Sequence, residues 1–570
     1  MTIGQIVHSR RQVGSKRGVV AAGHEAEAAA GVRILEQGGN AVDAAVAAAF
    51  VAFVVEPNNC SVGGYGHLAS YLPEHGGFVT VDHGPRVPLA GTPDMFRTIE
   101  DPDAGPYDWP DVVDDANDVG GLSVATPGAV PGLWAIHQRA GRLPWRDLLQ
   151  PAIEEARAGV RIDYGLLIEI VARMALIRRY PAAAGWLLRD GDPPAFYGQH
   201  GPGDRLDGQL LARTLERIAD EGPDALHRGE IAERIAAAVQ ADGGILTVED
   251  LAAYEPKVFV ETPVAYRGME VVTANDQVGA EALNILARFP LGDYEPGGFE
   301  HHHLLAEAVG HAFVDNQTHY GDPDHTESPV AGLASAAFAA ERARRISLDR
   351  VAPRPIAAAD PWPYDEGAAP VATPLPSVGG TRGTTQIVTA DGDGNVVALI
   401  TTIGGDYGSL IVVPETGILL NNSMMNWDPR PGRSNSIAPG KMPFFAVPAI
   451  VAARDGKAVF AAAGAGGYRI LASVMHTTVG VLDHGLPVQE AVDLPRSHGQ
   501  GEETYVDALV PAAVRERLRA AGHELVIEET TPAWASFGRV GAVTVDPESG
   551  ELAAAAGPFW STASGAASDA

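Results

Sequence analysis

Short apolar runs alternate with amphipathic stretches along the first part of the chain. Residues 18–22 form an apolar run that predicts a buried strand. Apolar positions at helical spacing predict a helix over residues 25–35, and a Gly-Gly pair ends it by supplying a left-handed cap. Asn40 then begins a second, Ala-rich helix over residues 41–54 as its N-cap. This opening predicts a strand covered by two closely packed helices.

The middle of the chain is predominantly helical, with isolated strands. A strand is predicted at residues 79–82 and another at residues 266–272. Thr247 and Asp250 have the spacing of a helix N-cap and its capping-box partner. Amphipathic spacing predicts helices over residues 131–139, 145–158 and 230–241.

A strand hairpin dominates the last third of the chain. Residues 383–388 enter an alternating apolar strand, and Asp391-Gly-Asp-Gly-Asn395 has the composition of a hairpin turn. The return strand, residues 396–403, carries Thr401 and Thr402. On this motif alone an ordinary hairpin is also a valid interpretation, because threonine pairs are common in strands.

Composition narrows the possible partners. The 570 residues carry a formal net charge of −31 from dispersed acids, which disfavours nucleic acid or an anionic membrane as a partner. The hydrophobic content of 46% and charged content of 20% are those of a soluble globular protein. The first twenty residues have no apolar core of a signal peptide, and no uncharged run is long enough for a membrane helix. We therefore expect a cytoplasmic protein.

Three other features are candidate chemical sites. Cys60 is the only cysteine, so it forms no intrachain disulfide, and no local signature marks it as a nucleophile. His303, His311 and His319 recur every eight residues, which does not align them on one helix face, so packing or surface histidines are favoured over a metal site. The glycines of residues 464–467 lack the third glycine of a dinucleotide loop. We expect no metal and no cofactor.

Motifs along nearly the whole chain resemble the γ-glutamyltransferase family of N-terminal-nucleophile (Ntn) hydrolases. The resemblance runs from about Gly18 to Gly557 and rests on the following runs: Gly38-Gly-Asn-Ala-Val-Asp-Ala-Ala-Val46, Gly63-Gly-Tyr-Gly66, Ala125-Thr-Pro-Gly-Ala-Val-Pro-Gly132, Gly383-Thr-Thr385, Gly417-Ile-Leu-Leu-Asn-Asn422 and Gly464-Ala-Gly-Gly467. It implies an α+β fold, a four-layer αββα sandwich built from both fragments of a self-cleaved precursor.

The resemblance also implies the chemistry. Family members cut themselves before a threonine, which matches Thr384, so Gly383 and Thr384 flank the expected cleavage site. The predicted fragments, residues 1–383 and 384–570, form a heterodimer, with a dimer of these heterodimers left open. Residues 349–383, rich in proline, alanine and acids, are expected to form a flexible segment before the cut, although a linker between two domains also fits that composition.

Thr384 suits this chemistry because a terminal threonine holds a hydroxyl nucleophile and an amine base in one residue. The reference pKa of an α-amine, roughly 7.7–8.0, lies near working pH. By the same resemblance, Thr402 orients the nucleophile, and Gly466 and Gly467 belong to the glycine turn of the oxyanion hole. The substrate is expected to be a small amide or peptide-like molecule.

The chain departs from the family where a glutamyl donor binds. The arginine that pairs with the donor carboxylate aligns with Gly84, although Arg86 lies nearby. The loop at residues 275–279 lacks the usual prolines and serines. The remaining positions predicted at the substrate site are Gly404 and Asn426, in place of an asparagine and an acid; Phe445 and Ala446, in place of a serine pair; and Ser423. A phenyl ring and a methyl group cannot hydrogen-bond a carboxylate, so a different acyl group is favoured.

Four functions therefore stay open. The first is a self-processing amidohydrolase or acyltransferase acting on a donor other than ordinary γ-glutamyl compounds. The second is a true γ-glutamyl hydrolase or transferase with a rearranged pocket. The third is a biosynthetic relative that cleaves an activated C–C bond. The fourth is an unprocessed binding protein, which retention of Thr384, Thr402 and the glycine turn disfavours.

Overall fold

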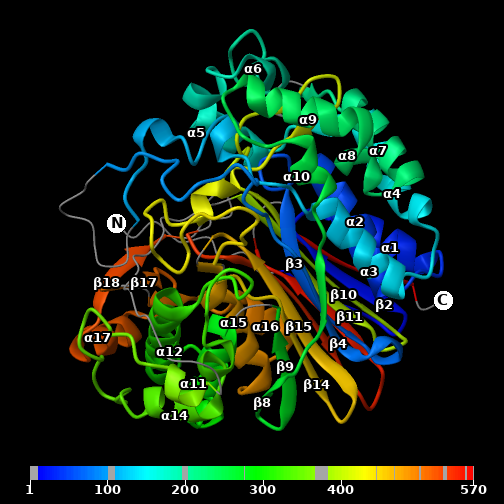
Figure 1. The fold of residues 1–570 in the computed structure, drawn as a ribbon. Coiled ribbons are helices and arrows are strands. Elements are labelled where there is room, and N and C mark those ends of the chain that lie inside the picture. Colours follow the sequence, from blue (N-terminus) through cyan, green and yellow to red (C-terminus); the bar gives the residue numbers. More distant parts are fainter. Residues whose placement is uncertain are drawn as a thin grey trace, which may run out of the picture.

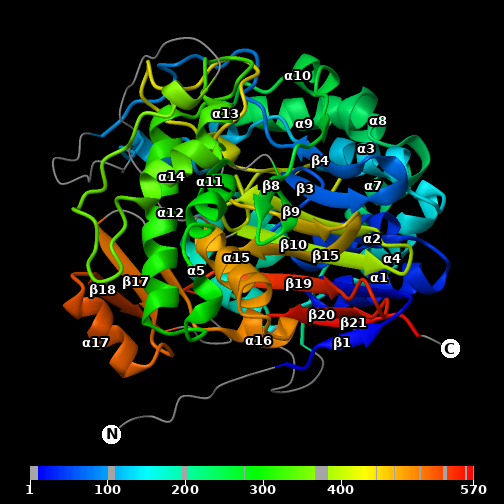
Figure 2. The same cartoon turned by 90° about the horizontal axis from the view of Figure 1, so that it is seen from below.

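Two seven-stranded sheets lie face to face at the centre of the molecule (Figures 1 and 2). The computed structural model describes residues 10–99, 109–195, 203–274, 277–365, 383–444, 446–467, 469–499, 502–529, 536–558 and 562–568. All strand pairs within the two large sheets are antiparallel in these residues.

We call the two sheets the first and the second sheet. The first has the order β21 (Ala563–Ala566), β2 (Gly18–Ala22), β10 (Gly383–Asp391), β11 (Val396–Gly404), β3 (Tyr65–Leu72), β4 (Gly77–His83), β7 (Lys257–Val260). The second has the order β1 (Val13–Ser15), β20 (Leu552–Ala556), β19 (Arg539–Val545), β15 (Lys457–Ala465), β14 (Ile450–Arg454), β9 (Met269–Thr273), β8 (Val264–Tyr266).

Helices cover the outer face of each sheet. Over the first sheet lie α1 (Glu25–Glu36), α2 (Ala41–Val55), α3 (Ala129–Ala140) and α4 (Trp145–Ala158), followed by α5 (Tyr164–Ile177), α6 (Pro181–Leu187), α7 (Gln209–Glu221), α8 (Asp224–His227), α9 (Gly229–Ala241) and α10 (Val248–Ala252). Over the second lie α11 (Gln277–Leu286), α12 (Phe299–His319), α13 (Val330–Leu333), α14 (Ala336–Ala343), α15 (Arg469–Leu482) and α16 (Val488–Asp493). The predicted αββα sandwich is confirmed.

Smaller elements complete the molecule. A three-stranded sheet, β16 (Ser497–Gly499), β17 (Glu503–Asp507) and β18 (Glu524–Glu528), packs with α17 (Ala512–Ala520). Two short pairs are β5 (Val160–Arg161) with β6 (Arg205–Leu206), and β12 (Val412–Val413) with β13 (Ile418–Leu419). Within the described ranges, six 3-10 turns lie at residues 73–75, 113–115, 121–123, 291–293, 362–364 and 423–426.

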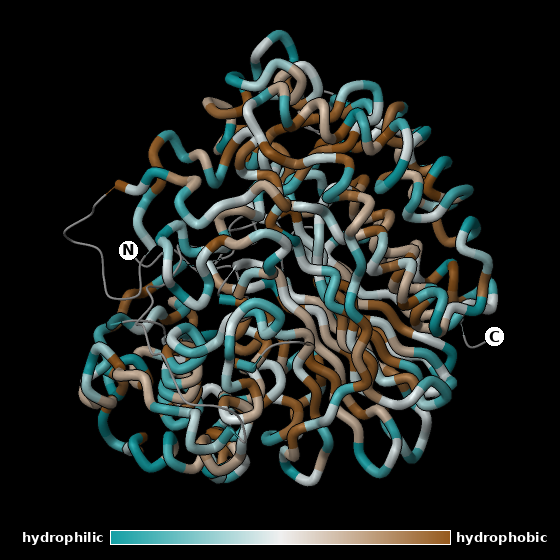
Figure 3. Tube along the Cα trace, viewed as in Figure 1, coloured by the Kyte–Doolittle hydropathy of each residue, from teal (hydrophilic) through white to brown (hydrophobic). Residues whose placement is uncertain are grey.

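Strand periodicity explains how the sandwich is filled. In β2, Val20 and Ala22 pack under the helices, whereas Val19 and Ala21 pack between the sheets. The layer between the sheets is built mainly from valine and alanine, which lets the two sheets approach closely. Apolar residues accordingly concentrate on the strands and on the inner helices (Figure 3).

Capping boxes fix where helices α2 and α10 begin. The Asn40 side chain accepts from the Asp43 amide at 3.0 Å, and the Asp43 carboxylate accepts from the Asn40 amide at 3.1 Å. Thr247 and Asp250 form the same capping box at α10. Both predictions from the sequence are confirmed.

The expectation of one strand over residues 266–272 is wrong. Arg267 and Gly268 adopt φ angles of 50° and 74° and form a two-residue hairpin turn between β8 and β9. A glycine at the second turn position accommodates such an angle without strain. The apolar run conceals the turn because Met269, Val271 and Val272 beyond it are buried.

The histidines of α12 are packing residues, and the surface alternative is wrong for most of them. His301, His302, His303 and His311 are buried. The His301 ring bonds those of His476, at 2.9 Å, and His484, at 3.0 Å. Among the described residues, no group of three or more His, Cys, Asp or Glu side chains could hold a metal ion.

Residues 349–365 are irregular but anchored to α12. The Ala352 amide donates to Glu307 at 2.9 Å, and the Ala359 amide donates to Asp315 at 2.6 Å. Both carboxylates are buried, so these bonds fix the backbone against the helix. The expected flexibility of this segment thus does not extend to its anchored part. Residues 366–382, the rest of the predicted pre-cleavage segment, lie outside the described residues.

Candidate active site

The hairpin of β10 and β11 brings two threonines opposite each other. Thr384 pairs with Thr402 across the ladder, and the register shifts between Gly383 and Thr384. Asp391 closes the far end, where its carboxylate accepts from the amides of Asp393 and Asn395. A well-fixed turn sets the register of a hairpin, so residues far from the site determine this pairing.

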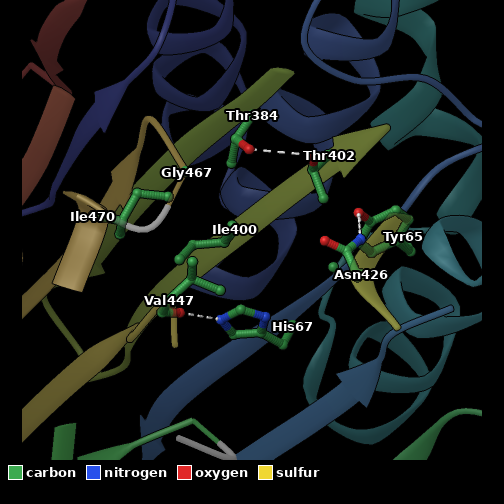
Figure 4. Close-up of a pocket in the computed structure, with 10 residues that line it drawn as sticks. Tyr65, His67, Thr384, Ile400, Thr402, Asn426, Val447, Gly467 and Ile470 are labelled. Atoms are coloured by element: carbon green, nitrogen blue, oxygen red, sulfur yellow. Dashed lines mark hydrogen bonds between the residues drawn. The ribbon is translucent and has the colours of Figure 1, made fainter. Parts of the chain in front are cut away.

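A chain of hydrogen bonds links the two hydroxyl groups to the backbone, and Figure 4 shows the bond between the hydroxyls. The Thr384 hydroxyl donates to the Thr402 hydroxyl oxygen at 3.2 Å. The Thr402 hydroxyl in turn donates to the Gly383 carbonyl oxygen and accepts from the Gly404 amide, the latter at 2.9 Å. The lone pairs of the Thr384 oxygen therefore point away from Thr402, and its orientation is fixed.

A pocket opens beside Thr384 at one end of the layer between the sheets. Strand alternation turns Thr384, Ile400 and Thr402 toward this layer. The space measures about 490 Å³ including its open side. Its lining residues are Tyr65, Gly66, His67, Thr384, Ile400, Thr402, Asn426, Val447, Gly467 and Ile470 (Figure 4). None of these side chains carries a full charge at neutral pH unless His67 is protonated.

His67 is held neutral. Its Nε2 lies 2.7 Å from the Val447 carbonyl oxygen, so the ring donates through Nε2 (Figure 4). Burial lowers the pKa of His67 below its ordinary value, and the Val447 bond and the Asp82 carboxylate offset only part of this shift. The sequence does not reveal this residue, because an isolated histidine in a strand gives no chemical signal.

Tyr65 is a second pocket residue that was not among those predicted from the sequence. Its hydroxyl oxygen accepts from Asn426 Nδ2 at 3.0 Å, and its hydroxyl also hydrogen-bonds Ser423 and Thr402. Burial raises the pKa of Tyr65 to about 12, so the phenol stays protonated. The sequence did contain one signal for Tyr65: it is an aromatic residue within the glycine run Gly63-Gly64-Tyr65-Gly66, and such runs otherwise favour small residues.

The glycine turn follows β15 at the opposite wall. Gly466 and Gly467 have φ angles of 130° and 67°, which favour glycine. Gly467 lines the pocket together with Thr384 (Figure 4). A Cβ on Gly466 would lie 2.9 Å from the Gly538 Cα, so the turn requires glycine for packing as well as for backbone angle.

Comparisons with known proteins agree with this arrangement. The gamma-glutamyltranspeptidase family model matches residues 28–567. An acylase ACY 1 proenzyme of Pseudomonas sp. (strain SE83) is 34% identical, covering 91% of this chain and 88% of the relative. A glutathione hydrolase proenzyme of Bacillus subtilis (strain 168) is 31% identical, covering 94% and 89%. The chain belongs to the gamma-glutamyltranspeptidase family.

Membership makes the protein an Ntn-hydrolase enzyme, and solved structures agree with the fold. The crystal structure of cephalosporin acylase from Bacillus halodurans superposes with a TM-score of 0.84 at 27% identity, covering 100% of this chain and 99% of that one. Gamma-glutamyltranspeptidase from Helicobacter pylori superposes with a TM-score of 0.52 at 27% identity, covering 62% and 95%. The four-layer sandwich is thus shared with family members that carry both kinds of name.

Several gamma-glutamyltranspeptidase positions differ in this member. Gly404 has a φ of 95°, and a Cβ there would lie 2.2 Å from Asn422 Oδ1, so close packing leaves no room for a side chain. Ala446 is buried in the apolar cluster under α11 and α12. Phe445 lies outside the described residues. Ser423 is buried and accepts from Asn426 at 3.0 Å, so it contacts a pocket residue.

Arg86 interacts with residues close to it in the fold and is not among the residues that line the pocket. Its guanidinium pairs with Asp82 at 3.1 Å, donates to the carbonyls of Gly84 and Pro85, and lies over the Tyr254 ring. These partners satisfy the half-buried arginine structurally. A role for Arg86 in substrate binding stays a prediction.

Cys60 does not qualify as a nucleophile. The side chain is buried, and burial raises the pKa of its thiol well above the ordinary value. The reactive form of cysteine is the thiolate, so this environment makes it inert.

In the described part of the chain, no helix is both long and apolar enough to cross a bilayer.

Proposed function

We propose that this protein cuts itself between Gly383 and Thr384 and then uses Thr384 as the nucleophile of an amide hydrolase or acyltransferase. The observation that carries the proposal is the Thr384–Thr402 hydroxyl pair at 3.2 Å on the wall of a pocket. It supports nucleophilic chemistry because the hydroxyl is held in a fixed orientation beside an open pocket.

For self-cleavage, the Thr384 oxygen attacks the Gly383 carbonyl carbon and the C–N bond breaks. The bond from Thr402 to the Gly383 oxygen supports this step, because it polarises the carbonyl under attack. The Thr384 nitrogen leaves as an amine and takes up the hydroxyl proton. Water then hydrolyses the ester, which leaves a Gly383 carboxylate and a free α-amine on Thr384.

For turnover, the freed amine accepts the Thr384 hydroxyl proton while the oxygen attacks the amide carbonyl of the donor. Amide groups of Gly466 and Gly467 are the proposed donors to the oxyanion. The amine leaving group departs with the proton, and an ester remains on Thr384. Water or a second amine then releases the acyl group, so the same intermediate serves hydrolysis and transfer.

The pocket supports an uncharged acyl group as substrate. Its aliphatic wall consists of Ile400, Val447 and Ile470, and its polar groups are the neutral side chains of Tyr65, His67 and Asn426. Burying the ammonium and carboxylate of a glutamyl donor against these side chains would leave both charges unpaired. We therefore favour the acylase side of the family, as in the relatives named acylase.

The first prediction concerns processing. The wild-type protein is expected to give two fragments whose masses meet at the Gly383–Thr384 bond, measured by intact mass spectrometry. Thr384→Ala is expected to stay a single chain, because it lacks the attacking oxygen. Thr385→Ala is the matched control, and it should be cut at the same bond. An uncut wild type after prolonged incubation would contradict the proposal and favour a binding protein.

The second prediction concerns the donor. The processed enzyme is expected to hydrolyse butyryl and phenylacetyl anilides with a kcat/KM at least about tenfold above that for γ-glutamyl anilide, since one unpaired charge costs more than 1.4 kcal/mol. Release of the aniline is followed by absorbance. A preference for the γ-glutamyl donor would reject the uncharged acyl group and restore a true γ-glutamyl enzyme with a rearranged pocket.

A further inference from the structure

A buried charged cluster lies directly behind Thr384, and neither the proposed cleavage nor the proposed turnover uses it. It consists of Arg539 in β19, Glu56 at the end of α2 and Glu27 in α1, with exposed fractions of 8%, 5% and 0%. Buried charge is costly unless it is paired and hydrogen-bonded, so the cluster calls for a physical account.

Arg539 connects the cluster to the nucleophile. Strand alternation directs Arg539 from the second sheet into the layer between the sheets, as it does Gly541 and Val543. Its Nη2 donates to the Thr384 carbonyl oxygen at 2.9 Å. The ladder between β10 and β2 begins only at Ile387, so at Thr384 the guanidinium replaces a strand neighbour as donor.

Glu56 holds Arg539 in this position. Glu56 Oε1 lies 3.6 Å from Arg539 Nη1 and also accepts from Asn59 Nδ2 at 2.9 Å. Gly23 makes room for the carboxylate, since a Cβ on Gly23 would lie 2.8 Å from Glu56 Oε2 and 2.0 Å from Thr385 Oγ1. The close approach of the β2–α1 turn to β10 is thus built around this ion pair.

Glu27 completes the cluster as a neutral acid. Burial and the neighbouring Glu56 carboxylate raise the pKa of Glu27 well above its ordinary value, and Glu27 hydrogen-bonds Glu56. Burial also acts to raise the pKa of Glu56, but Arg539 and the Glu27 bond outweigh it and the pKa is lowered. At neutral pH the cluster therefore holds one positive and one negative charge, and the positive charge is the one in contact with Thr384.

We propose that the Arg539 charge, fixed at the Thr384 carbonyl by Glu56, keeps the α-amine freed on Thr384 unprotonated at neutral pH and so sets the acidic limit of catalysis. Arg539 acts through Thr384 and is a positioning residue. A like charge within about 4–6 Å disfavours the ammonium form by one pKa unit or more. The inference rests on the proposed function, since it requires a free amine on Thr384.

Other titratable groups near Thr384 do not supply this charge. His67 and Tyr65 on β3 are neutral at pH 7, and the buried Cys60 stays a thiol. The remaining groups interact with neighbours of Thr384: Asp82 interacts electrostatically with His67, and His24 with Glu56. Among these groups Arg539 is the cation that bonds Thr384 itself.

The test compares charge-removing and charge-keeping variants at position 539. In Arg539→Met and Arg539→Gln, the midpoint of the acidic limb of kcat/KM is expected to rise by about one pH unit. Activity at pH 6 then falls about tenfold relative to wild type, whereas activity at pH 9 changes much less. Arg539→Lys keeps the charge and is expected to restore the wild-type limb.

Two further measurements separate charge from structure. The rate at which cyanate carbamylates the Thr384 amine, followed by mass spectrometry across pH, reports amine protonation without substrate and should shift with the kinetic limb. Arg267→Met is the matched control, because Arg267, like Arg539, binds a carboxylate and backbone carbonyl oxygen, but it does so in the β8–β9 turn. It is expected to lower Tm without moving the limb.

The outcomes divide clearly. An unmoved limb in processed Arg539→Met and Arg539→Gln, or an equal shift in Arg539→Lys, overturns the inference while the proposed function stands. Loss of self-cleavage in all three variants at wild-type Tm also overturns it, because Arg539 would then act on the cut and not on the amine. An uncut wild type rejects the proposed function itself before any variant at position 539 is compared.

Discussion

The hydroxyl of Tyr65 joins the two threonines to the polar wall of the pocket. It hydrogen-bonds Asn426 and Thr402, so its loss would loosen both. Tyr65→Phe is expected to lower kcat about tenfold, which corresponds to one hydrogen bond of about 1.4 kcal/mol. Steady-state kinetics on the best anilide donor measures it. Tyr71→Phe in the same strand is the control, and an equal loss there would mean general damage to β3.

At the residue scale, the sequence identified the groups that a motif carries and missed those that the fold recruits. Thr384 and Thr402 lie in recognisable sequence motifs, and the hairpin turn fixes their pairing. Arg539 reaches Thr384 from 155 positions away, and only the stacking of two sheets brings them together. A single sequence gives no signal for such a contact, because nothing in the residues around Arg539 points to Thr384.

The long helix α12 shows the same division at the scale of an element. The eight-residue recurrence of its histidines argued against a metal site, but their burial depends on α15, β16 and α17, which pack around the helix. The His302 ring lies 3.0 Å from Ser497 Oγ, and the His303 ring lies 2.8 Å from His523 Nε2. Along the chain, Ser497 lies 195 residues from His302 and His523 lies 220 residues from His303. Local sequence patterns therefore could not reveal these partners.

Buried neutral histidines make this helix layer sensitive to acid. Burial lowers the pKa of His302 to about 4, and it lowers the pKa of His301 and His476 well below the ordinary value. The unfolded chain binds these protons near pH 6.5, so stability is complete above that pH and is lost as the pH falls toward 4. His302 alone contributes about 3 kcal/mol to this loss.

This pH dependence can be measured by urea unfolding between pH 7.5 and 4.5. His302→Gln is expected to flatten the decline of the unfolding free energy, because glutamine binds no proton. His75→Gln, in a turn outside α12, is the control and should leave the decline unchanged. A decline of wild-type steepness in His302→Gln would assign acid sensitivity to carboxylates instead.

At the scale of the whole molecule, residues before and after Thr384 share both sheets. In the first sheet β10 and β11 lie between β2 and β3, and in the second β14, β15, β19 and β20 lie between β9 and β1. The fragments are therefore expected to coelute on size exclusion after cleavage and to separate only in denaturant. Elution as two separate species in native buffer would contradict this interleaving.

The position of β10 inside its sheet has a consequence for any attempt to rebuild the enzyme from parts. If a fragment beginning at Thr384 is made alone, the outer edges of its β10–β11 hairpin have no strand to pair with. Their partners, β2 and β3, belong to the other fragment. Exposed edges of this kind pair readily with copies of themselves. Gene fission, split-protein sensors and mix-and-match assembly would thus have to bring both halves together while they fold.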